Sequence, residues 1–485
     1  MQTLLMLLLP LAGMMLVRIF SGSRSVSRAA LVLSLASLAL TLFQVSIFNP
    51  AGGMQFIFDQ YWVESLGISF KFGLDGIGML LVLLTNVLVP LIIFSSFDRE
   101  IKDYKNYFSL IFLMQFALLG VFSALDGFLF YVFWELALIP IWFICLLWGG
   151  KDRIRITLKF FIYTLSGSLL MLVGLIYLYL QTPGTHSFDI ESFYRLTLNP
   201  EQQSWLFWAF FAAFAIKIPL FPFHTWQPDT YTTAPTQGTM LLSGIMLKMG
   251  LYGIIRWMLP VIPDGIAEWS WLAILLSVTG IVYASAMAIA QKDFKRLIAY
   301  SSIAHVGLIA AGIFSLNAMG LQGAMFQMIS HGINAVGLFF VVDILQQRFQ
   351  NRTMDEMGGI AHRSSYFATC FMIIMLGSIA LPLTNGFIGE FMLLSGLFNY
   401  SAWAAAIGGL TIIFGAVYML RAYQKIMLGN ETDASSSFSF LTMNEKILLG
   451  IIAVLVIASG IYPKPLLDIA GPSIENLLVQ TGKAL

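Results

Sequence analysis

The sequence is short of charge and of cysteine, and each shortage excludes a class of protein. Only 11% of its 485 residues are charged, whereas soluble globular chains carry about 25%, so an ordinary soluble enzyme is excluded. The two cysteines, Cys145 and Cys370, lie alone inside apolar runs. That placement excludes a disulfide framework or a thiolate metal cluster built from this chain. The net charge of +1 gives no indication of nucleic-acid binding.

Motifs for binding nucleotides or redox metals are also missing from the sequence. It contains no glycine-rich phosphate loop, no dinucleotide fingerprint and no cysteine spacing typical of metal ligands. We therefore expect no cofactor in this chain. The energy for its work must come from an ion gradient or from partner subunits.

Apolar residues dominate what is present. Hydrophobic residues make up 58% of the chain, mean hydropathy is +0.83 and phenylalanine occurs 41 times. A spanning helix needs about 20 apolar residues, and the apolar runs predict an all-α polytopic membrane protein with fourteen spans. The first run, Met1–Phe20, lacks a charged leader, so we expect a retained span rather than a signal peptide. The expected spans are 2–20, 27–48, 73–97, 107–124, 126–148, 156–180, 203–225, 238–258, 268–290, 296–314, 319–345, 366–399, 401–428 and 443–462.

The distribution of basic residues predicts the orientation of the chain. Most of the 26 lysines and arginines fall in alternate loops between the expected spans. Because basic loops face the cytoplasm, both termini are expected outside, and the number of spans is expected to be even.

Two of the expected spans carry helix-breaking residues at matching places. Pro219 and Pro222 interrupt one span, and Pro382 and Gly386 interrupt another. The pairs Ser166-Gly167 and His331-Gly332 are separated by nearly the same offset as the two breaks. Inverted repeats with broken helices are typical of transporters. The sequence thus predicts three N-terminal spans (1–106), two inverted five-helix repeats (107–258 and 268–428) and a last span with a short tail (429–485).

Six ionisable residues lie near the middle of expected spans, where a charge costs about 2.5–3.5 kcal/mol on insertion scales. Carboxylate, amine and imidazole groups can each hold and release a proton. The order acid, base, base, histidine, histidine, acid suits a lateral proton relay. The six residues are Glu135, Lys217, Lys248, His305, His331 and Glu390.

The same residue types also fit roles without proton transfer. Glu135 and Lys217 would fit a static buried ion pair, and Lys248 a structural role. The two histidines would fit ordinary core histidines, or a single haem's axial pair. Asp75 and Asp126 lie near outer helix ends, where their role is either structural or gating.

Five sequence strings around these residues resemble the antiporter-like membrane subunits of respiratory complex I, the proton-translocating NADH–quinone oxidoreductase. The resemblance runs in order from about residue 70 to residue 430. It implies a hydrated polar axis at mid-membrane, with the six ionisable residues as proton carriers. The strings are Phe133 to Pro140, Ala215 to Asp229, Leu247 to Gly253, Gln291 to Ser302 and Asn385 to Phe391.

Within that family, Glu390 resembles the M type of subunit (chain 4 in mitochondria). The L and N types and the multisubunit Na⁺/H⁺ antiporters usually carry lysine there. The resemblance implies a bacterial inner-membrane subunit between neighbouring antiporter-like subunits, with NAD, FMN, Fe–S clusters and quinone in partner subunits. A subunit of a Na⁺/H⁺ antiporter, or a structural scaffold with inert relics, are the competing hypotheses.

Overall fold

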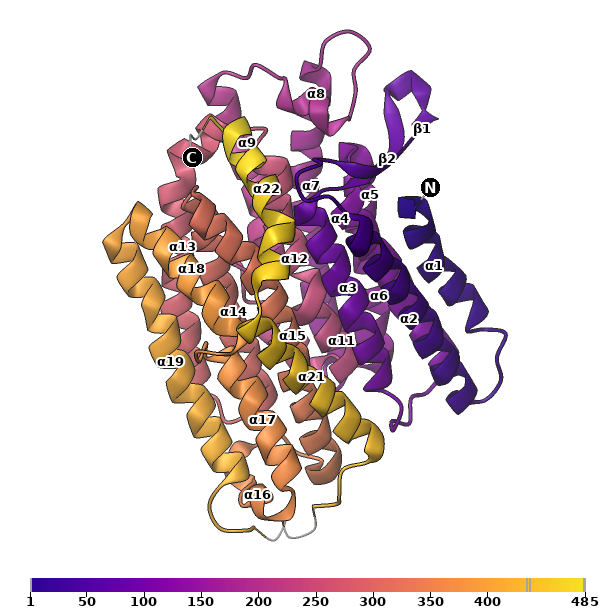
Figure 1. Ribbon diagram of the computed structural model, residues 1–485, viewed down its shortest axis with the longest axis vertical. Helices are drawn as coiled ribbons and strands as arrows, with labels where there is room; N and C mark the ends of the chain where they lie inside the picture. Colours follow the sequence, from indigo (N-terminus) through magenta and orange to yellow (C-terminus); the bar gives the residue numbers. More distant parts are fainter. Residues whose placement is uncertain (1, 433–434, 436–437, 483–485) are drawn as a thin grey trace.

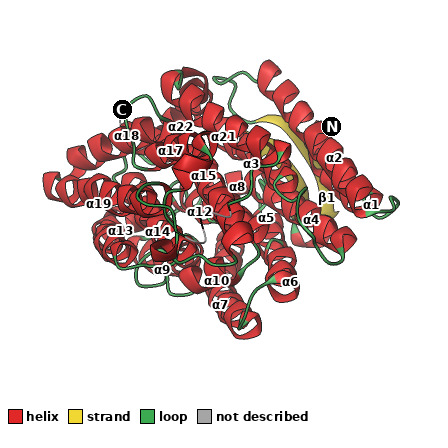
Figure 2. Ribbon diagram, turned by 90° about the horizontal axis from the view of Figure 1, so that it is seen from below, coloured by secondary structure: helices red, strands yellow, loops and turns green. Residues whose placement is uncertain are grey.

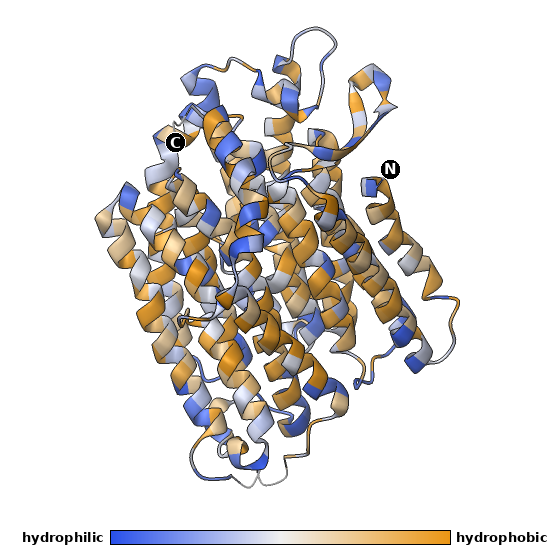
Figure 3. Cartoon of the chain, in the orientation of Figure 1, coloured by the Kyte–Doolittle hydropathy of each residue, from blue (hydrophilic) through white to orange (hydrophobic). Residues whose placement is uncertain are grey.

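The long apolar runs form helices, because a helix satisfies its own backbone hydrogen bonds where a bilayer core offers no other partner. The computed structural model describes residues 2–432, 435 and 438–482, and its helices run side by side along one long axis (Figure 1). Hydrophobic residues cover these helices, while hydrophilic residues gather in the connections at the two ends of the bundle (Figure 3).

The first half of the chain contains nearly all of the irregular elements. Its elements in order are α1 (Gln2–Leu16), α2 (Ser23–Ile47), β1 (Gln55–Val63), η1 (Glu64–Leu66), β2 (Ile68–Leu74), α3 (Gly76–Phe94), α4 (Tyr104–Ser123), α5 (Gly127–Leu136), α6 (Leu138–Trp148), α7 (Arg153–Gln181), α8 (Ile190–Tyr194), α9 (Pro200–Lys217), α10 (Gln227–Thr233), α11 (Thr236–Leu241), η2 (Leu242–Met246), α12 (Lys248–Gly253) and η3 (Ile254–Met258).

The second half consists mostly of long helices. Its elements in order are α13 (Pro263–Ile289), α14 (Phe294–Phe314), α15 (Ala318–Phe349), η4 (Met354–Glu356), α16 (Ile360–Arg363), α17 (Ser365–Ser378), α18 (Asn385–Tyr400), α19 (Ala402–Met427), α21 (Met443–Ile461) and α22 (Lys464–Gln480).

Within the described residues, eleven helical segments are long and apolar enough to cross a membrane. Each lies on one of the fourteen spans expected from the sequence. The remaining three expected spans fall on shorter or broken helices, namely α1, α9 and the pair α17–α18. The chain is therefore a multi-pass membrane protein, while fourteen spans stays a prediction.

Two elements were not foreseen. Strands β1 and β2 pair as an antiparallel hairpin between the second and third spans, and this hairpin is the one sheet within the described residues. The end of the chain, expected to be a short tail, forms helix α22, which packs along α3 and α15. Both elements pack at the start of α3. Strand β2 ends at Leu74, two residues before α3 begins. Helix α22 lies so close that a Cβ on Gly76 would be 1.9 Å from the carbonyl oxygen of Ile469.

The helices differ in how far they are buried, and this separates the centre of the bundle from its rim. Viewed along the bundle, α15, α12 and α3 lie inside, and α1, α2, α7 and α19 lie at the edge (Figure 2). The apolar windows of α14, α15 and segment 236–258 are 100% buried, against 28% for α2 and α19. Polar chemistry on the three central segments is thereby shielded from the surroundings of the bundle.

Both predicted breaks are present. Helix α9 ends at Lys217 and the chain resumes helical form only at Gln227. Helix α17 ends at Ser378, and α18 begins at Asn385 after two residues with positive φ, Ala380 and Leu383. Proline cannot donate the helix hydrogen bond, and this accounts for the place of both interruptions.

The two chain ends lie at the same end of the bundle (Figure 1). We call this end the terminal face. The hairpin, α8 and the last turns of α22 also lie there, and α16 lies at the opposite end.

Candidate functional site

Lys248 sits in an irregular stretch of helix at the centre of the bundle. The π-helical segments η2 and η3 flank it, so the backbone here is wider than an α-helix. The Leu247 N–H donates to the Leu242 carbonyl, five residues back, at 3.2 Å. The Ser243 carbonyl then accepts the Lys248 ammonium at 2.7 Å. The wide turn thus supplies a backbone acceptor to a buried cation, as such turns do at functional sites.

The Lys248 ammonium also reaches a histidine on a neighbouring helix. Its Nζ lies 2.9 Å from Nδ1 of His331 on α15, and both side chains are buried. The other ring nitrogen of His331, Nε2, lies 3.0 Å from the Ser302 hydroxyl on α14. Three elements therefore meet at one continuous hydrogen-bonded path, although the sequence alone gave Lys248 no obvious acidic partner.

A second hydrogen-bonded group lies beside the first. His305 Nδ1 lies 2.9 Å from Oε1 of Glu390, which is 1% exposed. Gln327 on α15 donates to the same carboxylate oxygen at 3.3 Å. Glu390 occupies the second turn of α18, directly after the second helix break. The break sets the start of α18, and this places the carboxylate against α14 and α15.

A small cavity separates these two groups. The rings of His305 and His331 are 6.2 Å apart between centroids, too far for a direct hydrogen bond. The cavity, of about 20 Å³, is lined by both histidines together with Ser302, Gln327 and Asn334. A volume of this size holds a water molecule when polar partners surround it. His305 Nε2 and the Asn334 side-chain oxygen are buried there without a partner in the described part of the chain.

Glu135 and Lys217 stand apart from this chain of contacts. Within the described residues no ion pair joins them, and neither Glu135 Oε1 nor Lys217 Nζ has a hydrogen-bond partner. The Lys217 ammonium lies 5.1 Å from the ring centroid of Trp134, the neighbour of Glu135. The static ion pair considered from the sequence is therefore absent, and an aromatic face holds the cation instead.

Uncharged residues complete the site, and the sequence analysis did not single them out. Asn334 donates to Asn385 at 3.1 Å, and the Ser330 hydroxyl donates to the Asn385 carbonyl at 3.1 Å. These contacts tie α15 to the first residue of α18. Polar residues of this kind occur throughout the spans, so the sequence does not distinguish these three. The structure does, because it shows that their side chains face the centre of the bundle.

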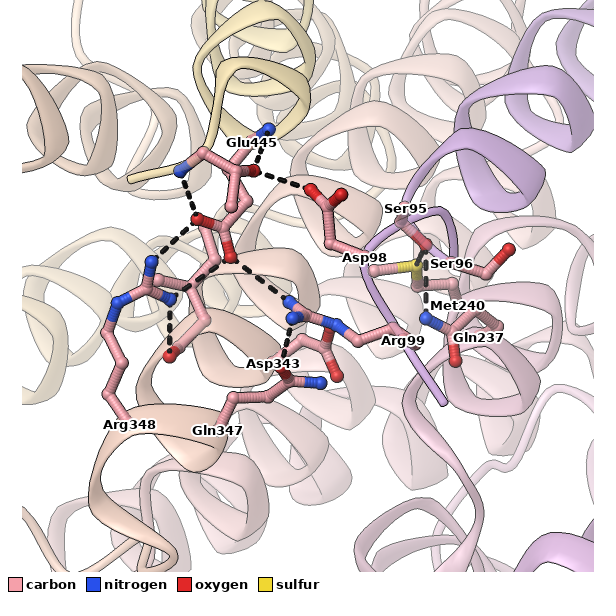
Figure 4. Close-up of polar contacts among 12 residues, drawn as sticks. Ser95, Ser96, Asp98, Arg99, Gln237, Met240, Asp343, Gln347, Arg348 and Glu445 are labelled. Carbon is pink, nitrogen blue, oxygen red and sulfur yellow. Dashed lines mark hydrogen bonds and ion pairs between the residues drawn. The ribbon is translucent and has the colours of Figure 1, made fainter. Parts of the chain in front are cut away.

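An ion-pair cluster lies where the end of α3, α15 and the start of α21 meet. Arg348 and Arg99 reach the two carboxylate oxygens of Glu445 at 2.7 and 3.3 Å, and Arg99 also reaches Asp343 at 2.7 Å (Figure 4). The Arg348, Glu445 and Asp343 side chains are at most 10% exposed. Asp343 and Arg348 belong to the same helix as His331, so the cluster fixes the position of the helix that carries the central histidine.

Metal chemistry finds no support in the described residues. Across residues 2–432, 435 and 438–482, no group of three or more His, Cys, Asp or Glu side chains could hold a metal ion. His305 and His331 instead face a carboxylate and an ammonium.

Comparisons with known proteins bear on the whole chain. Residues 124–456 match the family described as NADH:quinone oxidoreductase/Mrp antiporter, TM. NADH-quinone oxidoreductase subunit M of Rickettsia conorii is 43% identical over 452 residues, covering 93% of this chain and 91% of the relative. Respiratory complex I from Thermus thermophilus with bound NADH contains a chain that superposes with a TM-score of 0.88 at 29% identity, covering 99% of this chain and 100% of that one.

A chain of the Mrp complex from Dietzia sp. is similar in fold. It superposes with a TM-score of 0.83 at 17% identity, covering 99% of this chain and 55% of that chain. At this identity the likeness concerns the fold alone.

Proposed function

The chain belongs to the NADH:quinone oxidoreductase/Mrp antiporter transmembrane family, and on that premise we propose that it is a proton-translocating membrane-arm subunit of an NADH–quinone oxidoreductase. Quinone reduction in partner subunits drives the movement of protons through its Glu, Lys and His side chains. NAD, FMN, Fe–S clusters and quinone belong to those partners. Neighbouring antiporter-like subunits flank it in a bacterial inner membrane, with the terminal face outward.

The observation that carries this proposal is the pair of hydrogen-bonded groups at the centre of the bundle. Lys248 contacts His331, and His305 contacts Glu390, both at 2.9 Å. Proton transfer requires such heavy-atom separations, or one intervening water. The small cavity between the histidines supplies the place for that water. A proton passes from Lys248 through His331 and His305 to Glu390, while Glu135 and Lys217 load the first half.

The order of the elements supports two inverted repeats, 107–258 and 268–428. In each, a stretch of several non-helical residues interrupts the fourth segment, between α9 and α10 in the first repeat and between α17 and α18 in the second. Lys217 precedes the first break and Glu390 follows the second. Broken helices in corresponding positions mark ion pathways in transporters.

The alternative, a subunit of a multisubunit Na⁺/H⁺ antiporter, has weaker support. The Mrp likeness is at 17% identity, whereas the relative at 43% identity carries the name of an oxidoreductase subunit. Glu390 also stands where the antiporter relatives usually carry lysine.

The experiment that tests the function replaces the last carboxylate of the path. Glu390→Gln keeps the shape of the side chain and removes its titration, so the assembled complex should lose most of its proton pumping per NADH oxidised. The matched control is Glu475→Gln, an exposed glutamate on α22, with His362→Ala as a second control. Pumping is measured in proteoliposomes at matched quinone reduction rates. Pumping unchanged by Glu390→Gln would remove this residue from the path.

A further inference from the structure

The terminal face contains a cavity that reaches Arg256, eight residues beyond Lys248 in the same helical segment. It has a volume of about 450 Å³ and lies between the hairpin, α8 and the last turns of α22. Its lining includes Lys71, Glu191, Tyr194 and Ser473, and it opens past exposed residues such as Arg195. Because the cavity is roomy and polar, water can occupy it.

An ion pair forms the floor of this cavity. Arg256 and Asp75 both line it, with Arg256 Nη2 at 2.5 Å from Asp75 Oδ1. Their side chains are only 7% and 8% exposed. Asp75 Oδ1 also accepts the Gly78 N–H at 2.9 Å, as the N-cap of α3. The Asp75 carboxylate therefore interacts with a cation and a backbone N–H donor at the same time.

Beneath the floor, aromatic residues fill the helix interface. Arg256 Nε lies 3.4 Å from the Tyr252 hydroxyl, which donates to the Phe122 carbonyl at 3.2 Å. The Tyr252 and Phe122 rings pack edge to face at 5.5 Å. Lys248 follows one turn further in. At 1.5 Å per residue, Arg256 stands about 12 Å along the axis from Lys248.

We infer that the Arg256–Asp75 pair is an electrostatic barrier that stops a proton on Lys248 from leaving directly to the terminal face. This inference rests on the proposed function and deepens it. With the direct exit closed, the proton takes the lateral path through His331 and His305 to Glu390. Without such a barrier, water in the cavity and the charge on Lys248 would be separated only by one aromatic layer.

The barrier follows from the chemistry of the two side chains. Arginine stays protonated in proteins, so Arg256 repels a proton approaching from either side, as arginine does in water channels that exclude protons. Among the described residues that line the floor, Asp75 is the group able to accept a proton, and protonating it would leave Arg256 buried without its counter-ion. Arg256 therefore opposes passage through its charge, and Asp75 holds the guanidinium in place.

Replacing the two members of the pair should have different effects on the proton leak. Arg256→Met leaves Asp75 free to take a proton from the cavity and pass it inward, so the passive proton leak should rise roughly tenfold. Asp75→Asn keeps an oxygen facing Arg256 and keeps the cation, so the leak should stay at the unmodified level. Arg256→Lys keeps the positive charge, so its proton leak should also stay at the unmodified level. Arg195→Met, at the exposed rim, is the control.

The measurement uses the complete complex reconstituted in proteoliposomes. A potassium diffusion potential drives protons, and an internal pH-sensitive dye reports their flux without NADH or quinone. The result is independent of redox-driven pumping, so failure of the barrier and failure of the Glu390→Gln test are distinguishable. Equal leaks in Arg256→Met and Asp75→Asn would indicate a loss of structure and overturn the inference. An unchanged leak in both would overturn it too. If Arg256→Met does not assemble, Arg256→Gln replaces it with the same expectation.

Discussion

Two buried lysines in this chain are stabilised in different ways. Lys248 has two partners within hydrogen-bond distance, the Ser243 carbonyl and His331. Lys217 has no hydrogen-bond partner within the part of the chain described here, and its ammonium lies 5.1 Å from the ring centroid of Trp134. A buried cation without hydrogen bonds is held weakly. Lys217 is therefore the lysine whose partner can change most readily during turnover.

This difference gives a prediction for the first half of the path. Glu135→Gln removes the nearest titratable acid in that half, and Lys217→Met removes its base, so each change should abolish most proton pumping by the assembled complex. The complex should still assemble, because no hydrogen bond or ion pair of Lys217 is lost. Dye-monitored pumping in proteoliposomes checks this. Full pumping with Glu135→Gln would show that the acid has no part in loading.

Asp126, at the terminal face, gives a pH-dependent prediction. It caps α5 through the Leu129 N–H at 2.9 Å and accepts the Ser69 N–H of β2 at 3.1 Å. Burial raises the pKa of Asp126 from 3.8 to about 6, against the opposing effect of these N–H donors. Between these values the folded protein holds a proton that the unfolded chain has released. Stability is thus present at low pH and lost as pH rises through about 6.

A shift of this size corresponds to about 3 kcal/mol. Asp126→Asn cannot titrate, so its melting temperature, relative to the unmodified complex, should rise between pH 4 and pH 7. The comparison uses the slope of melting temperature against pH. The loss of one hydrogen-bond acceptor for the Ser69 N–H does not depend on pH, so it does not affect that slope. Parallel melting curves across this range would contradict the assigned pKa.

At the scale of elements, the second helix break depends on close backbone packing. A Cβ on Gly386, the second residue of α18, would lie 2.1 Å from the Gly377 carbonyl oxygen of α17. Gly386→Ala should therefore push α18 away from α17, destabilise the complex by about 1–3 kcal/mol and reduce pumping, because α18 carries Glu390. Gly409→Ala on α19 is the matched control, since nothing lies within 4 Å of its added Cβ. Melting temperature and pumping are measured for both. Equal behaviour of the two variants would contradict this account of the break.

The sequence predicted some elements and missed others for identifiable reasons. Proline at 219, 222 and 382 marks both breaks, because proline removes a helix hydrogen bond whatever surrounds it. The π-helical turns beside Lys248 have no such marker, since any residue can occupy them. Helix α22 was missed because Lys464, Asp468 and Glu475 break up its apolar pattern. The hairpin was missed because its two strands are much shorter than a membrane span and therefore form no long apolar run.

The candidate site likewise has a part that the sequence predicted and a part that it did not. Its six ionisable residues stand out in the sequence because charges are rare in apolar runs. The contact of Lys248 with His331 depends on the rotation and depth of two helices more than 80 positions apart, and no local pattern encodes it. The family, in contrast, follows from strings that hold several such residues at fixed spacing, and the match over residues 124–456 confirms that resemblance.

At the scale of the whole molecule, the proposed function makes the chain depend on partner subunits for its energy. The described residues contain no candidate metal group, and the sequence contains no nucleotide motif. Purified alone in liposomes, the chain should build no proton gradient on addition of NADH and quinone. The complete complex under the same conditions is the positive control. A gradient built by the lone chain would refute the proposed dependence on redox partners.

The two wide turns around Lys248 bear on how segment 236–258 responds to a change in its length. A π-turn holds one residue more than an α-turn, so η2 can lose a single residue and close into regular α-geometry while the helix beyond it keeps its facing. Such a deletion would leave Lys248 turned toward His331 and Arg256 turned toward Asp75, but it would remove the wide turn that presents the Ser243 carbonyl to the Lys248 ammonium. In a regular α-helix the same deletion would rotate everything beyond it by about 100°. The wide turns thus allow this stretch a change in length that would break both contacts in a regular helix.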